Sequence, residues 1–301
     1  MKIRAEIKAQ ALRGFTSRYW PVVGINILGA LIIAAMGYIP TVGWLLSLLV
    51  GTVIAVGLNG FFLNVYRGDQ IKVENLFSPF NRYGRVLGGS LWMALWLFLW
   101  SLIFIVPFVA IFVVGIVNTV ISSIDFSNLG SLGHVAPPDI TPNQIFGMFL
   151  NPWWLLLYLL LIPAIIKSYS YFATRYILAD SPNVGAIEAL TLSQKMMYGF
   201  KWKLFVTQLS FILWFLPGIG AAVLFCLSIN SLISAAASGY FWVFSIFNGF
   251  STLTIALILI LAQALLSIFY VGPYYNAAIA GFYDEVREQA KQKGIQGAEL
   301  L

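Results

Sequence analysis

The sequence predicts an all-α protein, a polytopic transmembrane helical bundle of about six spans with kinked helices. Two observations carry this prediction. The 301 residues are 60% hydrophobic and only 9% charged, with a mean hydropathy of +0.88, whereas about 25% of the residues in a soluble domain are charged. The apolar stretches are also about 20 residues long or longer, and a helix of that length crosses a bilayer.

The distribution of cations predicts the topology. All 17 lysines and arginines fall in the amino-terminal arm, at 66–85, at 167–203 and near the carboxyl end, and the connecting stretches between these groups hold none. Cytoplasmic loops retain Lys and Arg in this way. We therefore expect six crossings of a cytoplasmic membrane, with the amino and carboxyl termini inside.

The expected organisation is a single integral membrane domain over 1–301. It comprises a cytoplasmic amphipathic arm at 1–19, a six-span bundle at 20–272 and a cytoplasmic tail at 273–301. The first two spans, at 20–39 and 42–66, are joined by a very short uncharged link, which predicts a tight helical hairpin.

The third apolar run, at 86–122, is longer than a bilayer requires: as a helix it would extend about 55 Å at 1.5 Å per residue. Pro107 removes a backbone donor inside it and predicts a kink or a break. Either the helix projects outward, or its second half is re-entrant. Whether this span is a single long helix or a broken one is left open by the sequence.

The outer loop at 123–141 ends in a capping-box pattern, Thr141-Pro142-Asn143-Gln144, which predicts a short helix. Span four is expected at about 153–174, span five at about 204–233 and span six at about 251–272. For span five the sequence again leaves open whether it is one helix or broken.

The sequence offers little for catalysis. The one histidine, His134, lies in the outer loop near Asp125 and Asp139, whereas metal sites need three or four suitably spaced ligands. Motifs of hydrolases, phosphate-binding loops and paired cysteines are also missing from the sequence. We therefore predict no catalytic residue, no metal site, no cofactor and no enzymatic activity.

A lysine inside span four is the exception to an uncharged bundle. Lys167 follows Pro163, and intramembrane charge is costly and often functional. One interpretation is structural, because Lys167 lies about two turns from the cytoplasmic end and its side chain can snorkel there. The other is a contact with an anion, a lipid headgroup or a partner, made together with residues at helical spacing: Ser168, Tyr171 and Arg175.

The region between spans four and five predicts a cytoplasmic interfacial helix at 182–198. This helix, with Lys195, Lys201 and Lys203, is the candidate for docking a membrane protein or a transporter ATPase. The formal charge of +6 comes from the cations of the inner face. It favours anionic headgroups of membrane lipids as partners, and no nucleic acid.

Four segments form a recognisable pattern. They are the start MKIRAEIKAQA, the linker RGDQIKVENLFSPFNRYGRVLG, the run at 160–220 that contains ILADSP and KWKLF, and the tail VGPYYNAAIAGFYDEV. Together they resemble the domain of unknown function 975 family of bacterial integral membrane proteins. They are also similar to the membrane region of some glycerophosphodiester phosphodiesterases. Stretches at about 108–150 and 221–269 look like additions. The resemblance implies a membrane protein and carries no activity with it.

The leading functional hypothesis is a non-enzymatic binding, accessory or immunity-type component of the cytoplasmic membrane. The alternative is a transporter or channel for a small or lipid-like solute, in which the proline-containing spans line a cavity. A membrane enzyme acting on lipid is the third hypothesis, and it lacks a visible catalytic set.

Overall fold

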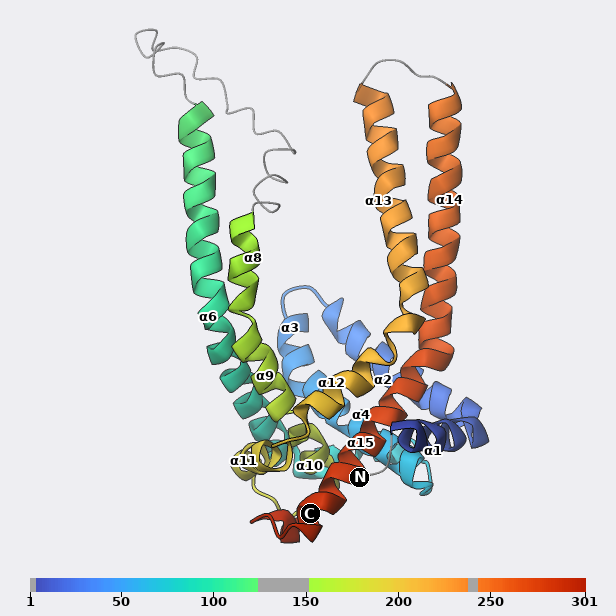
Figure 1. The fold of residues 1–301 in the computed structure, drawn as a ribbon. Helices are drawn as coiled ribbons and strands as arrows, with labels where there is room; N and C mark the ends of the chain where they lie inside the picture. Colours follow the sequence, from blue (N-terminus) through green and yellow to red (C-terminus); the bar gives the residue numbers. More distant parts are fainter. Residues whose placement is uncertain (1–3, 124–151, 238–242) are drawn as a thin grey trace. The chain divides into compact units, whose positions relative to one another are not determined.

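The structure is a computed structural model that describes residues 4–123, 152–237 and 243–301. Within these ranges the chain forms helices and turns and no strand (Figure 1), so the predicted all-α class is confirmed. Six helices in this part of the chain are long and apolar enough to cross a membrane. They are Tyr19–Gly37, Gly43–Arg67, Glu74–Asn118, Leu156–Asp180, Leu216–Ile233 and Gly249–Gln292.

The chain divides into two compact units. Unit 1 comprises residues 1–90 and 172–301, and unit 2 comprises residues 91–171. The expectation of a single integral membrane domain stays a prediction, as does the cytoplasmic placement of the termini.

Unit 1 begins with α1 (Arg4–Ser17), which shows the amphipathic pattern predicted for the arm. Ile7, Ala11 and Phe15 lie four residues apart and are fully buried, because this spacing places them on one face of a helix. That face packs against α4 (Thr52–Arg67) and α15 (Gly272–Gln292).

The first two predicted spans form the expected hairpin. The first is α2 (Tyr19–Gly37); the second is continuous through α3 (Gly43–Leu46), η1 (Ser47–Gly51) and α4. A glycine makes the tight link possible: a Cβ on Gly43 would lie 2.4 Å from the carbonyl oxygen of Met36.

The third span is one helix. After α5 (Glu74–Phe77) and η2 (Ser78–Arg82), α6 runs unbroken from Tyr83 to Ser123 with Pro107 inside it. The re-entrant alternative is therefore wrong. Proline removes one hydrogen bond, and the 41-residue helix retains its hydrogen-bonded turns on both sides. The outer loop at 123–141 and the Thr141–Gln144 motif lie outside the described residues except at Ser123, and so do His134, Asp125 and Asp139.

The fourth span is interrupted twice. Unit 2 holds α8 (Pro152–Leu159) and α9 (Ile162–Ser170), and α10 (Thr174–Asp180) follows in unit 1. The span predicted at about 153–174 corresponds to the membrane-span-like stretch Leu156–Asp180, and its helix is interrupted before Pro163, which lies in the first turn of α9. Proline suits the first turn, where its missing N–H is not needed.

The fifth span is also broken, whereas the sixth is longer than predicted. α12 (Lys201–Leu209) and η4 (Ile212–Trp214) precede α13 (Leu216–Ala237). α13 pairs with α14 (Val243–Leu266), and Figure 1 shows the two side by side. The helix of the sixth span continues beyond residue 272: α14 is followed without a break by η5 (Ser267–Val271) and α15.

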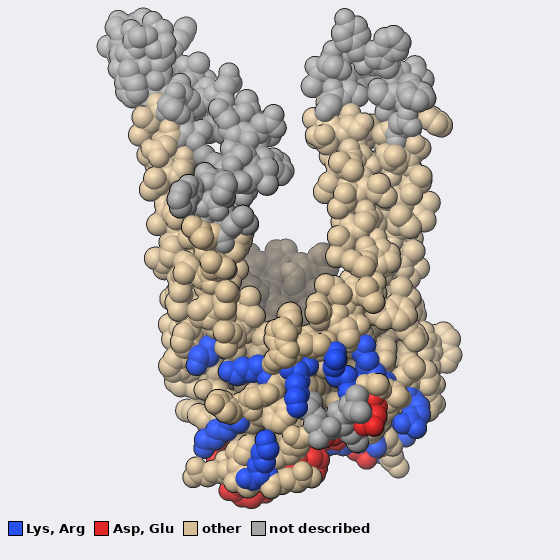
Figure 2. All heavy atoms as spheres, viewed as in Figure 1, with Lys and Arg blue, Asp and Glu red and all other residues tan. Residues whose placement is uncertain are grey.

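A helix lies within the predicted range 182–198 as α11 (Ala186–Met196), and its placement at the membrane interface stays a prediction. Val184 and Leu190 are buried, whereas Ile187 is 59% exposed. The carboxyl-terminal η6 (Ala298–Leu300) completes unit 1. Charged side chains gather near the ends of the helices, and the paired shafts of α13 and α14 carry none (Figure 2). We call this charged part of unit 1 its polar end.

Candidate functional site

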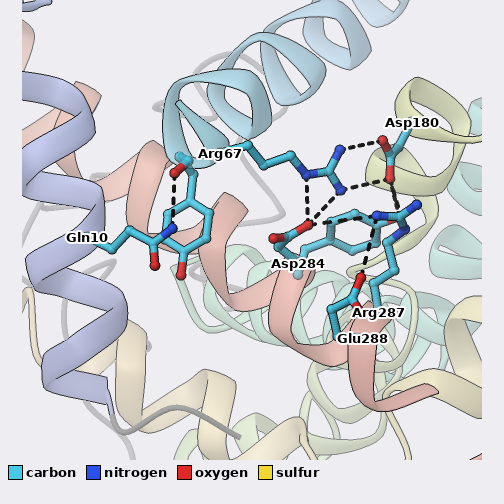
Figure 3. A network of polar contacts seen from close by, with 8 residues as sticks. Gln10, Arg67, Asp180, Asp284, Arg287 and Glu288 are labelled. Carbon is cyan, nitrogen blue, oxygen red and sulfur yellow. Dashed lines mark hydrogen bonds and ion pairs between the residues drawn. The ribbon is translucent and has the colours of Figure 1, made fainter. Parts of the chain in front are cut away.

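Four charged side chains from three helices meet at the polar end of unit 1. Arg67 comes from α4, Asp180 from α10, and Asp284 and Arg287 from α15 (Figure 3). We call this set the ion cluster. Two guanidinium groups face two carboxylates, so the cluster carries no net charge.

Local sequence places each member where it can meet the others. Arg67 is the last residue of α4, and Gly68 ends that helix with a φ of 83° and an N–H donated to the carbonyl of Asn64. A left-handed residue after a helix is usually glycine. Asp180 likewise ends α10, whereas Asp284 and Arg287 are three residues apart and share one face of α15.

Arg67 makes the closest contacts in the cluster. Its Nη1 and Nη2 donate to the two carboxylate oxygens of Asp180 at 2.8 and 3.1 Å, and its Nε and Nη2 donate to Oδ1 of Asp284 at 2.8 and 2.6 Å. The planar guanidinium matches a carboxylate in this paired geometry. One side chain therefore joins α4 to both α10 and α15.

Arg287 closes the cluster from the other side. Its Nε lies 3.2 Å from Oδ2 of Asp180, and its Nη1 lies 4.0 Å from Oδ1 of Asp284. The four side chains are only 12–22% exposed. Removing one partner of such a pair leaves an uncompensated charge in a poorly hydrated place, so the cluster is a structural junction.

The helices that carry the cluster are packed tightly against one another. Tyr283 directly precedes Asp284 on α15. It is fully buried and stacks on Tyr176, with ring centroids 4.9 Å apart. A Cβ on Gly281 would lie 2.2 Å from the ring of Tyr66, and one on Gly57 would lie 2.0 Å from the carbonyl oxygen of Leu76. Glycine at these two positions lets the elements approach.

A polar pocket of about 200 Å³ lies beside the cluster. Its wall includes Asp180, and its other polar side chains are Asn64, Asn75 and Ser78. The carboxylate of Asp180 is already held by two arginines, so it is not poised as a general base. Within the described residues, the structure holds no group of three His, Cys, Asp or Glu that would bind a metal.

A second junction secures the end of α10. Arg85, near the start of α6, donates from Nη1 to the carbonyls of Ser181 and Val184 at 3.0 and 2.8 Å, and from Nη2 to that of Leu178 at 2.7 Å. Terminal carbonyls of a helix lack partners within it, and a cation there also complements the helix dipole.

The candidates predicted in span four do not lie on one helix. Lys167 and Ser168 are in α9, Tyr171 is in the turn that follows, and Arg175 is in α10. The single helix that would align their side chains is therefore absent. Lys167 places its Nζ 4.7 Å from the centroid of the Trp100 ring, and Tyr171 is buried. A ligand contact by these residues stays a prediction.

The lysines predicted for docking lie around the turn between α11 and α12. Nζ of Lys195 donates to Oε1 of Gln296 at 3.3 Å. Lys203 lies over the ring of Phe200 at 5.3 Å, and Lys293 over the same ring at 5.2 Å. Lys201 opens α12 and is half-buried. Their role in docking stays a prediction.

None of the seven predicted residues belongs to the ion cluster, which sequence reasoning missed. A clue was nevertheless present. Arg67 begins the RGDQ linker, Asp180 lies in ILADSP, and Asp284 lies in the FYDEV tail that Arg287 follows. Three of the segments that carried the resemblance thus converge here, although they are far apart in the sequence.

The fold and this site define an α-helical protein with six membrane-span-like helices, in which charged junctions link α4, α10 and α15, and α6 with α10. The chain belongs to the family described as protein of unknown function DUF975, whose model matches residues 1–290. The match thus runs across both stretches that looked like additions. No curated protein and no solved structure matches the chain. The likeness to membrane regions of glycerophosphodiester phosphodiesterases stays a prediction.

Proposed function

We propose that this chain is a non-enzymatic integral membrane protein of the bacterial cytoplasmic membrane, acting as a binding, accessory or immunity-type component. The ion cluster is the observation that supports this proposal most directly. Its carboxylates and guanidiniums are paired with one another. The charged residues that three family-like segments bring together therefore hold helices in place.

The proposed orientation has the polar end of unit 1 in the cytoplasm. Its support is the concentration of Lys and Arg there, since cytoplasmic loops retain these residues. In that orientation, exposed cations would contact the anionic headgroups of the inner leaflet.

The proposed docking surface comprises Lys195, Lys201 and Lys203 with two exposed aromatic side chains beside them. Tyr198 is 83% exposed and Trp202 is 72% exposed. Aromatic side chains are enriched at protein interfaces and at membrane interfaces. Lysines around such rings would suit an acidic face of a membrane protein or of a transporter ATPase.

Co-purification tests this proposal. The chain would be isolated from membranes in a neutral detergent, both as wild type and with Lys195, Lys201 and Lys203 changed to Glu. We expect a defined partner that the charge-reversed variant loses. The control reverses Arg4, Arg13 and Lys72, which are exposed cations of α1 and of the linker before α5. Identical partners for all three proteins would refute the docking surface.

One observation favours a transporter or channel as the second candidate. Span four is discontinuous, with turns at 160–161 and at 171–173, and discontinuous spans commonly form the solute sites of transporters. Reconstitution into liposomes tests this candidate. A flux of small or lipid-like solutes that Lys167→Met abolishes would support it, whereas equal flux through empty liposomes would refute it.

A further inference from the structure

A pair of arginines lines a second pocket at the polar end of unit 1. Arg82 and Arg85 both face a cavity of about 250 Å³, together with Ser78 and Asn81. Arg82 ends η2 and Arg85 lies in the first turn of α6, where the helix dipole is positive. Every residue that lines this pocket belongs to unit 1.

Arg82 and Arg85 have donors to spare. Arg82 is exposed, and among the described residues no ion pair and no side-chain hydrogen bond joins it to a partner. Arg85 donates from Nη1 to carbonyls that follow α10 and from Nη2 to the carbonyl of Leu178 within α10, but its Nε is buried without a hydrogen-bond partner. Neither arginine is neutralised by a carboxylate in the part of the chain that the structure describes, unlike Arg67 in the neighbouring cluster.

Two unneutralised guanidiniums and the amide of Asn81 have the donors that a phosphate group requires, whereas the hydroxyl of Ser78 already donates to the carbonyl of Asn75. Arginine supplies donors in a planar fork that matches phosphate oxygens. A buried donor without a partner costs free energy, and a bound phosphate oxygen would satisfy it. The charge and the hydrogen-bonding groups thus point to the same ligand chemistry.

The rest of the wall indicates that this phosphate belongs to a lipid. Pro79, Val86, Leu178 and Ala179 line the same cavity. Val86 also begins the uncharged run of α6 that continues to Ser123. In a bilayer, the boundary between arginine and apolar helix would lie at the depth of the phospholipid headgroups.

We propose that this pocket binds the phosphate of an anionic phospholipid, with Arg82 and Arg85 as its ligands. This inference rests on the proposed membrane location and deepens it by naming the lipid class and the residues. Binding at this pocket differs from the general attraction of anionic lipids to surface cations, because it depends on the residues of this one pocket.

Lipid titration of the purified full-length chain in neutral detergent tests the site. The probes are dioctanoyl phosphatidylglycerol, dioctanoyl phosphatidylcholine and inorganic phosphate. We expect Arg82→Gln to weaken binding of phosphatidylglycerol about tenfold, as for the loss of one hydrogen-bonded charge. The matched control Lys291→Gln removes one exposed cation from α15, outside the pocket, and should change affinity less than about twofold.

Arg85→Lys provides a second variant, since it keeps the charge but loses the fork that also holds the end of α10. It is informative only when its elution on size-exclusion chromatography matches wild type, and then weaker lipid binding supports the site. Equal affinities for Arg82→Gln and Lys291→Gln, or equal binding of phosphatidylcholine, would overturn the proposal.

The same measurements distinguish a lipid phosphate from free phosphate. They also distinguish failure of the pocket proposal from failure of the proposed membrane location. Competition by inorganic phosphate at the lipid's own concentration would assign the site to free phosphate, whereas weak competition assigns it to lipid. If the chain needs detergent for extraction but Arg82→Gln binds normally, the pocket proposal fails and the membrane location stands. Recovery of the chain without detergent would instead count against the location.

Discussion

Arg67 on α4 holds Asp180 on α10 through two parallel hydrogen bonds of 2.8 and 3.1 Å, across 113 residues of sequence. The same guanidinium holds Asp284 on α15. A single side chain thus joins the ends of α4 and α10 to the middle of α15. The most direct consequence concerns stability.

Arg67→Ala should destabilise the fold by about 3 kcal/mol, because two partly buried carboxylates would lose their principal cation. Thermal unfolding in detergent, followed by size-exclusion chromatography of the remaining folded protein, measures this. Arg67→Lys keeps the charge but not the paired geometry, so its melting temperature should lie between those of Arg67→Ala and wild type. The exposed Lys291→Ala is the control. A melting temperature for Arg67→Ala equal to that of the control would show that the cluster contributes nothing.

Gly281→Ala should cost about 1–3 kcal/mol, the usual range for overpacking. Its added methyl group would lie 2.2 Å from the ring of Tyr66, which packs between helices and cannot move freely. The matched control is Gly220→Ala in α13, where nothing lies within 4 Å of the added carbon. Comparable melting temperatures for the two variants would contradict the close approach of α4 and α15.

Lys8 predicts a dependence on alkaline pH. Burial lowers the pKa of its amine below 10.5, and nearby Arg4 lowers it further. The charged form is thus less favourable in the folded state, so the cost is present at neutral pH and disappears as the pH rises through the folded pKa to 10.5. Thermal scans should show the advantage of Lys8→Met over wild type shrinking across this window. Lys291→Met should show no such trend, and a constant difference for Lys8→Met would refute the prediction.

Cysteine labelling tests the orientation of α13 and α15. Cys226 is exposed on α13, an uncharged helix. Facing lipid, it should resist a charged maleimide in intact cells and react after denaturation. In a Cys226→Ala background, Lys293→Cys should react in inverted vesicles but not in intact cells. Labelling of Lys293→Cys from outside would overturn the cytoplasmic placement of the carboxyl end.

The sequence predicted what depends on composition and length, namely helical class, six spans and the hairpin at 20–66. It did not predict the breaks around 160 and 210, because proline is compatible with both outcomes: Pro163 and Pro217 start helices, whereas Pro107 lies inside one. The local sequence shows that proline lacks a backbone N–H donor, but it does not show whether packing against neighbouring helices offsets the lost hydrogen bond.

The ion cluster was beyond sequence reasoning for a different reason. Asp180 and Asp284 each look like ordinary charged residues near a helix end, and only the packing of α4, α10 and α15 brings them to Arg67. Lys167 attracted attention because it stands in an apolar run, yet isolation in sequence does not reveal partners in space. The family-like segments were the better guide to the junction.

The continuous helix from Gly249 to Gln292 fixes the directions in which side chains along its length point relative to one another. Each residue of an α-helix turns the next by about 100°, so the direction in which Asp284 and Arg287 point is set by the number of residues between them and the α13–α14 pair. Deleting a single residue of α15 between Gly272 and Asp284 would turn both charges about 100° away from Arg67, without altering one side chain of the cluster. The number of residues in this helix, as much as their identity, therefore determines whether Asp284 and Arg287 can meet Arg67.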